Sequence, residues 1–137
     1  MKHLTQEEVK RISDKVLSLA KADECNVQVN GSRTGNIRYA RNAVSTSGVV
    51  EDTQMVVSVA FGKKQGIATI NEFDDKSLEK VVRRAEDLAR LAPENPEFMS
   101  AVAKQGYKET PTFVQKTADI DPEFRAQVAA YSIEACR

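Results

Sequence analysis

The sequence predicts an α+β fold, in which a four-stranded antiparallel meander covered by two helices is followed by an irregular segment and a third helix. Two stretches, residues 5–21 and 75–92, carry apolar side chains at helical spacing. Between them, four short runs alternate apolar and polar residues, as strands with one buried face do. The connections between these runs are short, which favours antiparallel pairing because a parallel crossover needs about a dozen residues.

The first helix is predicted to begin after Thr5. Thr5 and Glu8 have the spacing of a capping box, in which each side chain bonds the other residue's backbone amide. The helix is predicted to end near Lys21. Its expected apolar face consists of Val9, Ile12, Val16, Leu17 and Ala20.

The first two strands are predicted on either side of a glycine-containing turn. Cys25–Asn30 alternates apolar and polar side chains, and Ser32–Asn36 contains Gly35, which is typical of a turn. The second strand is predicted from Ile37 to Val44, with a less regular pattern.

The other two strands are predicted to form a hairpin. Gln54–Phe61 has the clearest alternation in the chain, and Gly62–Gly66 supplies a turn into Ile67–Ile70. The apolar face of such a meander must be covered, and two amphipathic helices are the expected cover.

The second helix is predicted to start near Asp75, whose carboxylate is a suitable cap, and to end before Pro93. Residues 93–120 show little periodicity but carry several large apolar side chains, so we expect an extended segment that docks on a surface. Asp121–Pro122 predicts the start of a third helix. The predicted division is thus 1–92, 93–120 and 121–137, the last part leading toward a missing carboxy-terminal domain.

Composition argues against several classes of function. The 137-residue chain carries twenty basic and twenty acidic side chains, and this balance disfavours binding to nucleic acid or to an anionic membrane. No apolar run approaches the roughly 18–20 residues that a membrane span needs, and a signal peptide is not apparent. Cys25 and Cys136 have no metal or redox spacing, so we expect reduced thiols in a cytoplasmic protein.

The chain offers few residues for catalysis. His3 is its only histidine and precedes the first predicted helix, whereas zinc sites and nucleophile–base pairs need imidazoles that are held in place. We therefore expect no metal ligands and no catalytic residues in this chain, which alone is expected to be inactive. The basic pairs Lys63–Lys64 and Arg83–Arg84 are interpreted as solvated surface.

The second predicted strand holds the candidate site. Arg38, Tyr39, Arg41 and Asn42 place three hydrophilic side chains beside an aromatic ring. One interpretation is a half-exposed strand with solvated side chains. The other is a surface that faces a missing domain or a bound extended peptide, since an exposed strand can pair with a peptide backbone.

Several phrases of the sequence follow one another in a characteristic order. They are Asn36–Val44, Val57–Gly62, Gln65–Asn71, Phe73–Leu78 and Ala85–Pro93, with Asp121–Pro122 before the last helix. Taken together, these phrases resemble the TldD/PmbA family. The resemblance extends over about residues 5–137, rests on order and spacing rather than on one diagnostic motif, and lies slightly nearer the PmbA branch.

The resemblance implies a two-domain protein connected with proteolytic maturation or degradation of peptides, also named a modulator of DNA gyrase. In TldD-type members a His-Glu-x-x-x-His helix of the second domain binds a catalytic metal, so a divalent metal, zinc, is expected in the missing domain or a partner subunit. PmbA-type members lack that helix and pair with a TldD-type subunit.

Two functions follow from these expectations. In the first, this chain is a non-catalytic domain that shapes a substrate chamber or subunit interface. Its partners are then its own carboxy-terminal domain, a second TldD/PmbA subunit in a homo- or hetero-oligomer, and a peptide substrate. The alternative is a free-standing protein- or peptide-interaction module without catalysis.

Overall fold

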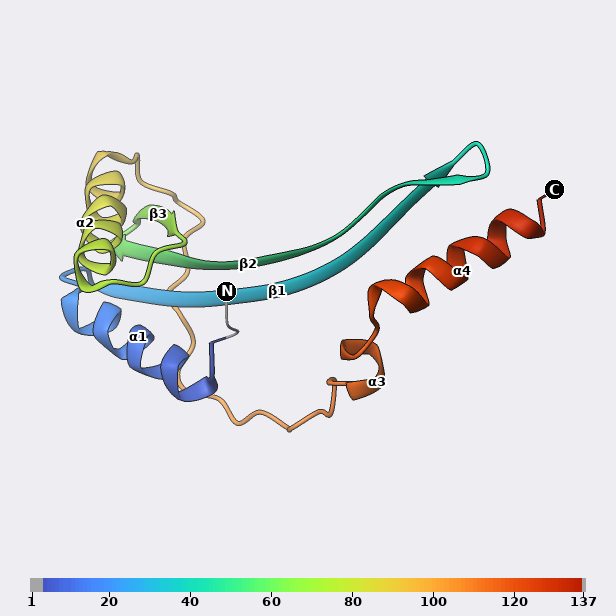
Figure 1. The fold of residues 1–137 in the computed structure, drawn as a ribbon. Coiled ribbons are helices and arrows are strands. Elements are labelled where there is room, and N and C mark those ends of the chain that lie inside the picture. The colour runs from blue at the N-terminus through green and yellow to red at the C-terminus, as the bar shows by residue number, and fades with distance from the viewer. Residues whose placement is uncertain (1–3, 137) are drawn as a thin grey trace. The chain divides into compact units, whose positions relative to one another are not determined.

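The structure is a computed structural model that describes residues 4–136 (Figure 1). Its elements, in chain order, are α1 (Gln6–Leu19), β1 (Glu24–Ala40), β2 (Ala43–Phe61), β3 (Lys64–Ile70), α2 (Asp75–Leu91), α3 (Gln115–Ala118) and α4 (Pro122–Glu134). The strands form an antiparallel sheet in the order β1-β2-β3. The chain divides into two compact units: residues up to Gly31 with Asp52–Gln105, and Ser32–Glu51 with the residues from Gly106 onward.

The predicted four-stranded meander is wrong, because the described residues form three strands. Ser32–Asn36, expected as a turn, lies inside β1. The chain reverses instead at Arg41 and Asn42, which have φ angles of 52° and 59°. Two successive residues with positive φ are the signature of a type I′ hairpin turn, whose twist matches that of the flanking strands. The predicted second strand is thus divided between β1, this turn and β2.

Helix α1 begins with the predicted capping box. The Glu8 amide donates to Thr5 Oγ1 at 3.2 Å, and the Thr5 amide donates to Glu8 Oε2 at 2.7 Å. Ile12 and Val16 are buried as expected, but the side of the helix that carries Leu17 is not covered, and Leu17 is 45% exposed.

Helix α2 begins at Asp75, as predicted, but its cap is the preceding residue. Asp74, rather than Asp75, is the cap, and its carboxylate accepts hydrogen bonds from the amides of Lys76 and Ser77 at 3.1 and 3.2 Å. Hydrogen bonds to the carboxylate, chiefly those with Ser77, lower the pKa of Asp74. Of the apolar side chains of α2, Leu88 is exposed, whereas the core-facing ones are buried: Leu78, Val81, Val82, Ala85 and Ala89.

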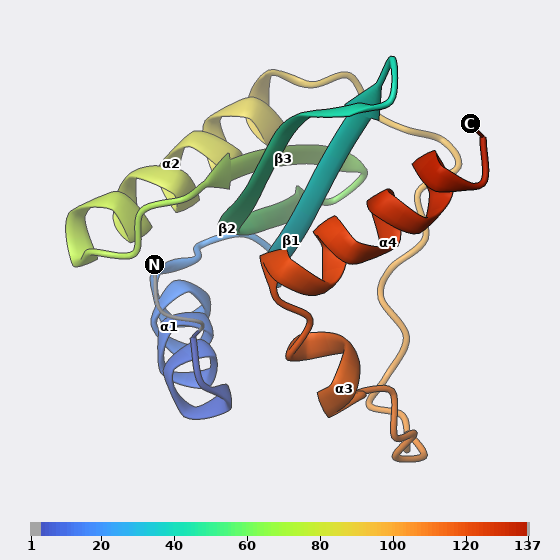
Figure 2. The same cartoon turned by 45° about the vertical axis from the view of Figure 1, so that its right-hand side comes forward.

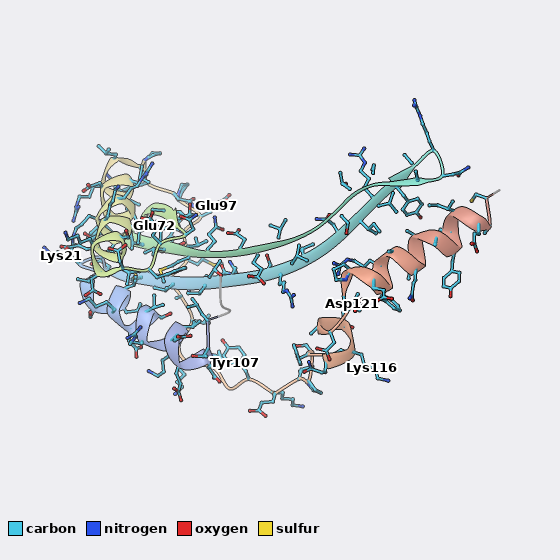
Figure 3. All side chains as sticks on the ribbon, in the orientation of Figure 1. Lys21, Glu72, Glu97, Tyr107, Lys116 and Asp121 are labelled. Carbon is cyan, nitrogen blue, oxygen red and sulfur yellow. The ribbon has the colours of Figure 1, made fainter. Side chains whose placement is uncertain are left out.

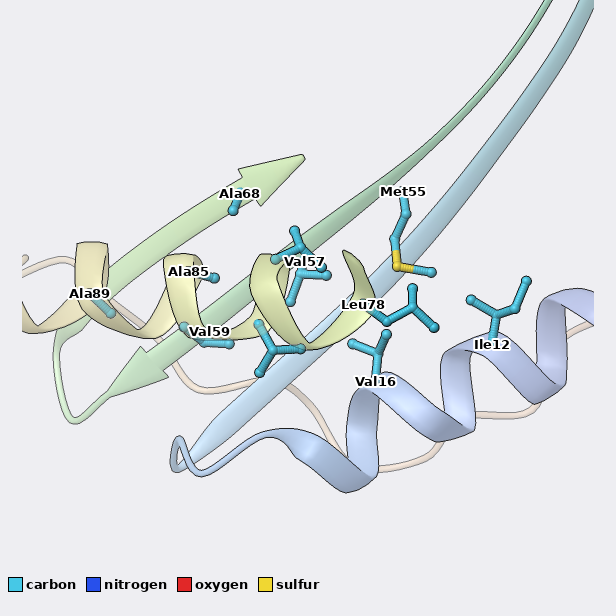
Figure 4. Close-up of a cluster of buried hydrophobic side chains, with 11 residues drawn as sticks. Ile12, Val16, Met55, Val57, Val59, Ala68, Leu78, Ala85 and Ala89 are labelled. Atoms are coloured by element: carbon cyan, nitrogen blue, oxygen red, sulfur yellow. The ribbon is translucent and has the colours of Figure 1, made fainter. Parts of the chain in front are cut away.

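The core of the first unit lies between one face of the sheet and the two helices (Figure 4). β2 contributes the most deeply buried strand residues, and β3 pairs with it so that Val59 lies opposite Gly66. A Cβ at Gly66 would clash with the backbone of Ala85 and Ala89, so the missing side chain lets α2 lie directly on β3. The cluster comprises Ile12, Val16, Met55, Val57, Val59, Ala68, Leu78, Val81, Val82, Ala85 and Ala89.

The segment after α2 is held on the face of the sheet that the two helices do not cover. The Asn95 amide donates to the Lys63 carbonyl at 3.0 Å, and the Asn95 side chain reaches Gln65 Oε1 at 3.4 Å. Further on, the Ala101 amide donates to Glu24 Oε2 at 3.1 Å. Gln65 and Glu24 alternate with residues that face the core, so both anchors belong to the face away from the helices.

A buried carboxylate joins the end of α1 to α2. Glu86 is 1% exposed and accepts the Lys21 amide at 2.6 Å and Arg83 Nη1 at 2.7 Å. Arg83 Nη2 also donates to the Leu19 carbonyl at 2.8 Å, so the interpretation of Arg83 as solvated is wrong. Burial by itself would raise the pKa of Glu86, but these hydrogen bonds and the arginine charges outweigh it and hold the pKa below its ordinary value.

Candidate functional site

The second unit contains a β-hairpin, residues 32–51, built from the end of β1 and the start of β2. A tight turn joins the two strands (Figure 2). Asn42 suits a positive φ because its short polar side chain tolerates this conformation, whereas for Arg41 the same conformation costs roughly 1–2 kcal/mol. We call residues Arg38–Val44 the hairpin tip.

The structure brings the four predicted site residues together at the hairpin tip. Arg38 and Tyr39 lie near the end of β1, and Arg41 and Asn42 form the turn itself. All four are exposed, with Tyr39 at 43%. The four are close neighbours in the sequence, and the turn, which the sequence pattern had placed elsewhere, sets them at the end of the hairpin.

Side-chain bonds link the two strands of this hairpin. Ser45 Oγ donates to the Arg38 carbonyl at 3.1 Å, and Ser47 Oγ donates to the Asn36 carbonyl at 3.3 Å. Nearer its base, Arg33 Nε lies 3.3 Å from Glu51 Oε1. These contacts stabilise a two-stranded ribbon, a structure that is only marginally stable in isolation.

Helix α4 contacts the hairpin through a glycine. Gly35 lies so close to the Arg125 guanidinium that a Cβ would clash with it. Arg125 Nη1 donates to the Ile120 carbonyl at 3.2 Å, while Nε and Nη2 are buried without a hydrogen-bond partner in the described part of the chain. Gly35 thus allows Arg125 to pack closely against β1, and it does not form the turn that the sequence predicted there.

Helix α4 itself begins as predicted at Asp121, whose carboxylate accepts the Phe124 amide at 2.8 Å, with Pro122 in the first turn. Figure 3 shows Asp121 at the start of this helix and Lys116 on α3. The apolar residues of α4 lie on all sides of the helix and do not form one stripe. Its buried residue is Ala129.

Large apolar side chains are exposed throughout the second unit. On the segment that leads to α3, Tyr107 is 89% exposed and Phe113 is 74% exposed (Figure 3). On α4, Tyr131 is 71% exposed and Phe124 is 51% exposed. Exposed aromatic groups in this number are typical of a surface that meets another part of a protein.

A second surface feature, in the first unit, had no signal in the sequence. It is an open depression with one carboxylate, two amides and one hydroxyl in its lining. The residues that line it are Asp52, Gln54, Thr69, Ile70 and Asn71.

The residues described do not fit a metal centre. Across positions 4–136, no group of three or more His, Cys, Asp or Glu side chains is placed to hold a metal ion. His3 lies outside the described residues. Both cysteines are free thiols, and burial, with the nearby charge of Glu86, raises the pKa of Cys25. Over the same described range, no helix is long and apolar enough to cross a membrane.

Comparison with known families supplies the identification. Residues 26–89, which run from β1 through most of α2, match the family model described as PmbA/TldA metallopeptidase domain 1. The chain carries a first domain of the TldD/PmbA family. The resemblance deduced from the order of sequence phrases is thereby confirmed.

Solved structures share the fold of this TldD/PmbA domain. TldE from Thermococcus kodakarensis matches with a TM-score of 0.77 and 18% identity over 96% of this chain and 28% of that one. A candidate modulator of DNA gyrase from Bacteroides thetaiotaomicron matches with a TM-score of 0.72 and 17% identity, over 91% of this chain and 30% of that one. A protein with the same description from Thermotoga maritima matches with a TM-score of 0.66 and 18% identity, over 89% of this chain and 28% of that one.

The chain therefore spans 28–30% of the length of these structures. A search among curated proteins found no match.

Proposed function

We propose that this chain is a non-catalytic part of a TldD/PmbA-type peptidase assembly that processes or degrades peptides. In this proposal the second unit shapes a substrate chamber or a subunit interface. The metal is supplied by a carboxy-terminal domain or by a partner subunit of a homo- or hetero-oligomer. The family match, to a metallopeptidase domain, supports the reaction class.

The hairpin tip is the observation that carries the proposal. It presents Arg41 and Asn42 on an exposed turn, with Arg38 and Tyr39 on the extended end of β1 that leads into it. An extended peptide binds by adding its backbone to such a strand, while side chains nearby orient it. The exposed aromatic residues of the same unit supply further surface for a neighbouring domain or subunit.

A cleavage assay on the full-length protein, with its partner subunit where one exists, tests this proposal. Cleavage of an unstructured peptide should occur and should be abolished by a chelator. The double variant Arg38→Ala, Asn42→Ala should cleave more slowly. Lys63→Ala is the matched control, because Lys63 is an exposed residue in the turn between β2 and β3.

The outcomes separate the two candidate functions. If the double variant cleaves as fast as the unaltered protein, the hairpin tip has no role in peptide handling. If the folded protein cleaves nothing under any combination of metal and partner, the free-standing interaction module becomes the better explanation.

A further inference from the structure

Two arginines at the hairpin tip have no ion-pair partner among the described residues. Arg38 and Arg41 are exposed, and within the part of the chain that the structure describes, the arginine ion pairs belong to Arg33, Arg83 and Arg90. Arg33 lies on the same hairpin and is paired with Glu51. The guanidinium at the base of the hairpin is therefore ion-paired, whereas the two at its tip can bind a ligand.

The backbone at Arg41 is a second, independent observation. Arg41 has a φ of 52° at the first position of the turn, where asparagine, aspartate or glycine is favoured. A residue in a strained conformation is characteristic of functional sites, where the side chain is needed at that point. A local preference for turn formation does not explain an arginine here.

Exposed apolar side chains flank the turn. Tyr39 precedes the turn and Val44 follows it, and their exposed fractions are 43% and 48%. A guanidinium binds a carboxylate through a fork of two parallel hydrogen bonds, and a neighbouring aromatic ring accommodates the aliphatic part of a bound side chain.

We propose that the hairpin tip selects acidic peptide segments, with Arg38 and Arg41 pairing with aspartate or glutamate side chains while Tyr39 and Val44 contact the apolar parts of the same peptide. This inference rests on the proposed function and adds a substrate class to it. A peptide is favoured over nucleic acid because the whole chain has a formal net charge of zero, whereas tight binding of a polyanion requires many cationic contacts.

Fluorescence anisotropy on the full-length protein tests the inference with matched peptides. One labelled peptide alternates glutamate with threonine, and its counterpart carries glutamine at every glutamate position. The acidic peptide should bind more tightly, and its advantage should shrink as salt rises from about 0.05 to 0.5 M. Arg38→Gln and Arg41→Asn should each weaken its binding by about two- to fivefold, as expected for exposed ion pairs, and Lys63→Gln should not.

Arg41→Asn also separates recognition from folding. Asparagine suits the turn, so this variant should unfold at the same or a higher temperature than the unaltered protein while binding the acidic peptide less well. Equal binding of the two peptides, or binding unaffected by both arginine variants, overturns the inference. Binding of single-stranded DNA with the same dependence on both arginines, in place of the acidic peptide, also overturns it and assigns the tip to phosphate.

The cleavage assay keeps this inference apart from the function on which it rests. Chelator-sensitive cleavage without acidic preference leaves the proposed function standing and removes the inference. Tighter binding of the acidic peptide without any cleavage supports the acidic selectivity of the hairpin tip and removes the proposed role in peptide cleavage.

Discussion

Among single residues, Glu86 ties two helices of the first unit together, because it is a buried carboxylate that bonds the Lys21 amide at the end of α1 and Arg83 on α2. Glu86→Gln should lower the free energy of unfolding by about 1–3 kcal/mol, since a hydrogen bond to a charged group contributes roughly that much. Urea denaturation at neutral pH measures the loss. Glu79→Gln is the control, because Glu79 lies on the same helix and is exposed.

The same residue predicts the direction of a pH effect. The pKa of Glu86 is lowered in the folded state. Its ionised form therefore stabilises the fold fully at pH values above the ordinary pKa of 4.5. This contribution is lost as the pH falls below 4.5 and through the lowered pKa of the folded state. Denaturation repeated at decreasing pH should therefore show the two proteins becoming more alike. A difference that grows on acidification contradicts this account.

Residues differ in how far the sequence reveals their roles. The capping box of Thr5 and Glu8 is a contact three residues apart, and a local pattern was enough to predict it. The bond between Arg83 and the Leu19 carbonyl joins residues 64 positions apart, and no local spacing predicts it. Asp74 and Asp75 are both suitable caps, and only the geometry of the helix start decides between them.

Among the elements, the turn between β1 and β2 depends on Asn42, whose φ is 59°. Asn42→Ala should destabilise the hairpin by about 1 kcal/mol, because a Cβ without a compensating polar group disfavours this conformation. Asn42→Gly should leave the stability of the hairpin unchanged or raise it slightly. Amide hydrogen exchange over residues 32–51 measures the opening of the hairpin, and equal exchange in the alanine and glycine variants would falsify the assigned turn.

The strands show why a glycine is an ambiguous signal. Gly35 predicted a turn, but it lies in β1 and makes room for Arg125, a contact with a residue 90 positions later by number. The true turn consists of Arg41 and Asn42, and an arginine at the first turn position gives no sequence signal. The hairpin of β2 and β3 was predictable because Gly62, with its positive φ, lies between two regular alternations.

Gly66 controls the contact between α2 and β3. Gly66→Ala should cost roughly 1–3 kcal/mol, because the new methyl group meets the backbone of Ala85 and Ala89 and the helix must move away. Thermal unfolding followed by circular dichroism measures the effect. Gly106→Ala is the matched control, since a Cβ at that position meets nothing within 4 Å. Equal melting temperatures for the two variants contradict the close packing described.

At the scale of the whole molecule, the sequence singled out four candidate residues but did not predict their arrangement. Arg38, Tyr39, Arg41 and Asn42 stood out because hydrophilic groups surrounded an aromatic residue on an extended segment. Their position at a turn depends on β1 running unbroken from Glu24 to Ala40. The continuity of a long strand is set by its pairing with β2, and pairing between distant residues leaves little trace in local alternation.

The exposed aromatic residues of the second unit lead to a prediction about the complete protein. This chain spans 28–30% of the matched structures, and we expect further chain to cover Phe124 and Tyr131, which are 51% and 71% exposed here. Phe124→Ser and Tyr131→Ser should each change the stability of the 137-residue chain by less than about 0.5 kcal/mol, as exposed substitutions do. In the full-length protein each should cost several times more, because a buried aromatic contact is lost. Thermal unfolding of both forms measures the difference. Equal, small effects in both forms would show that these side chains remain exposed in the complete protein, and the role of the second unit as an interface would then rest on the hairpin tip alone.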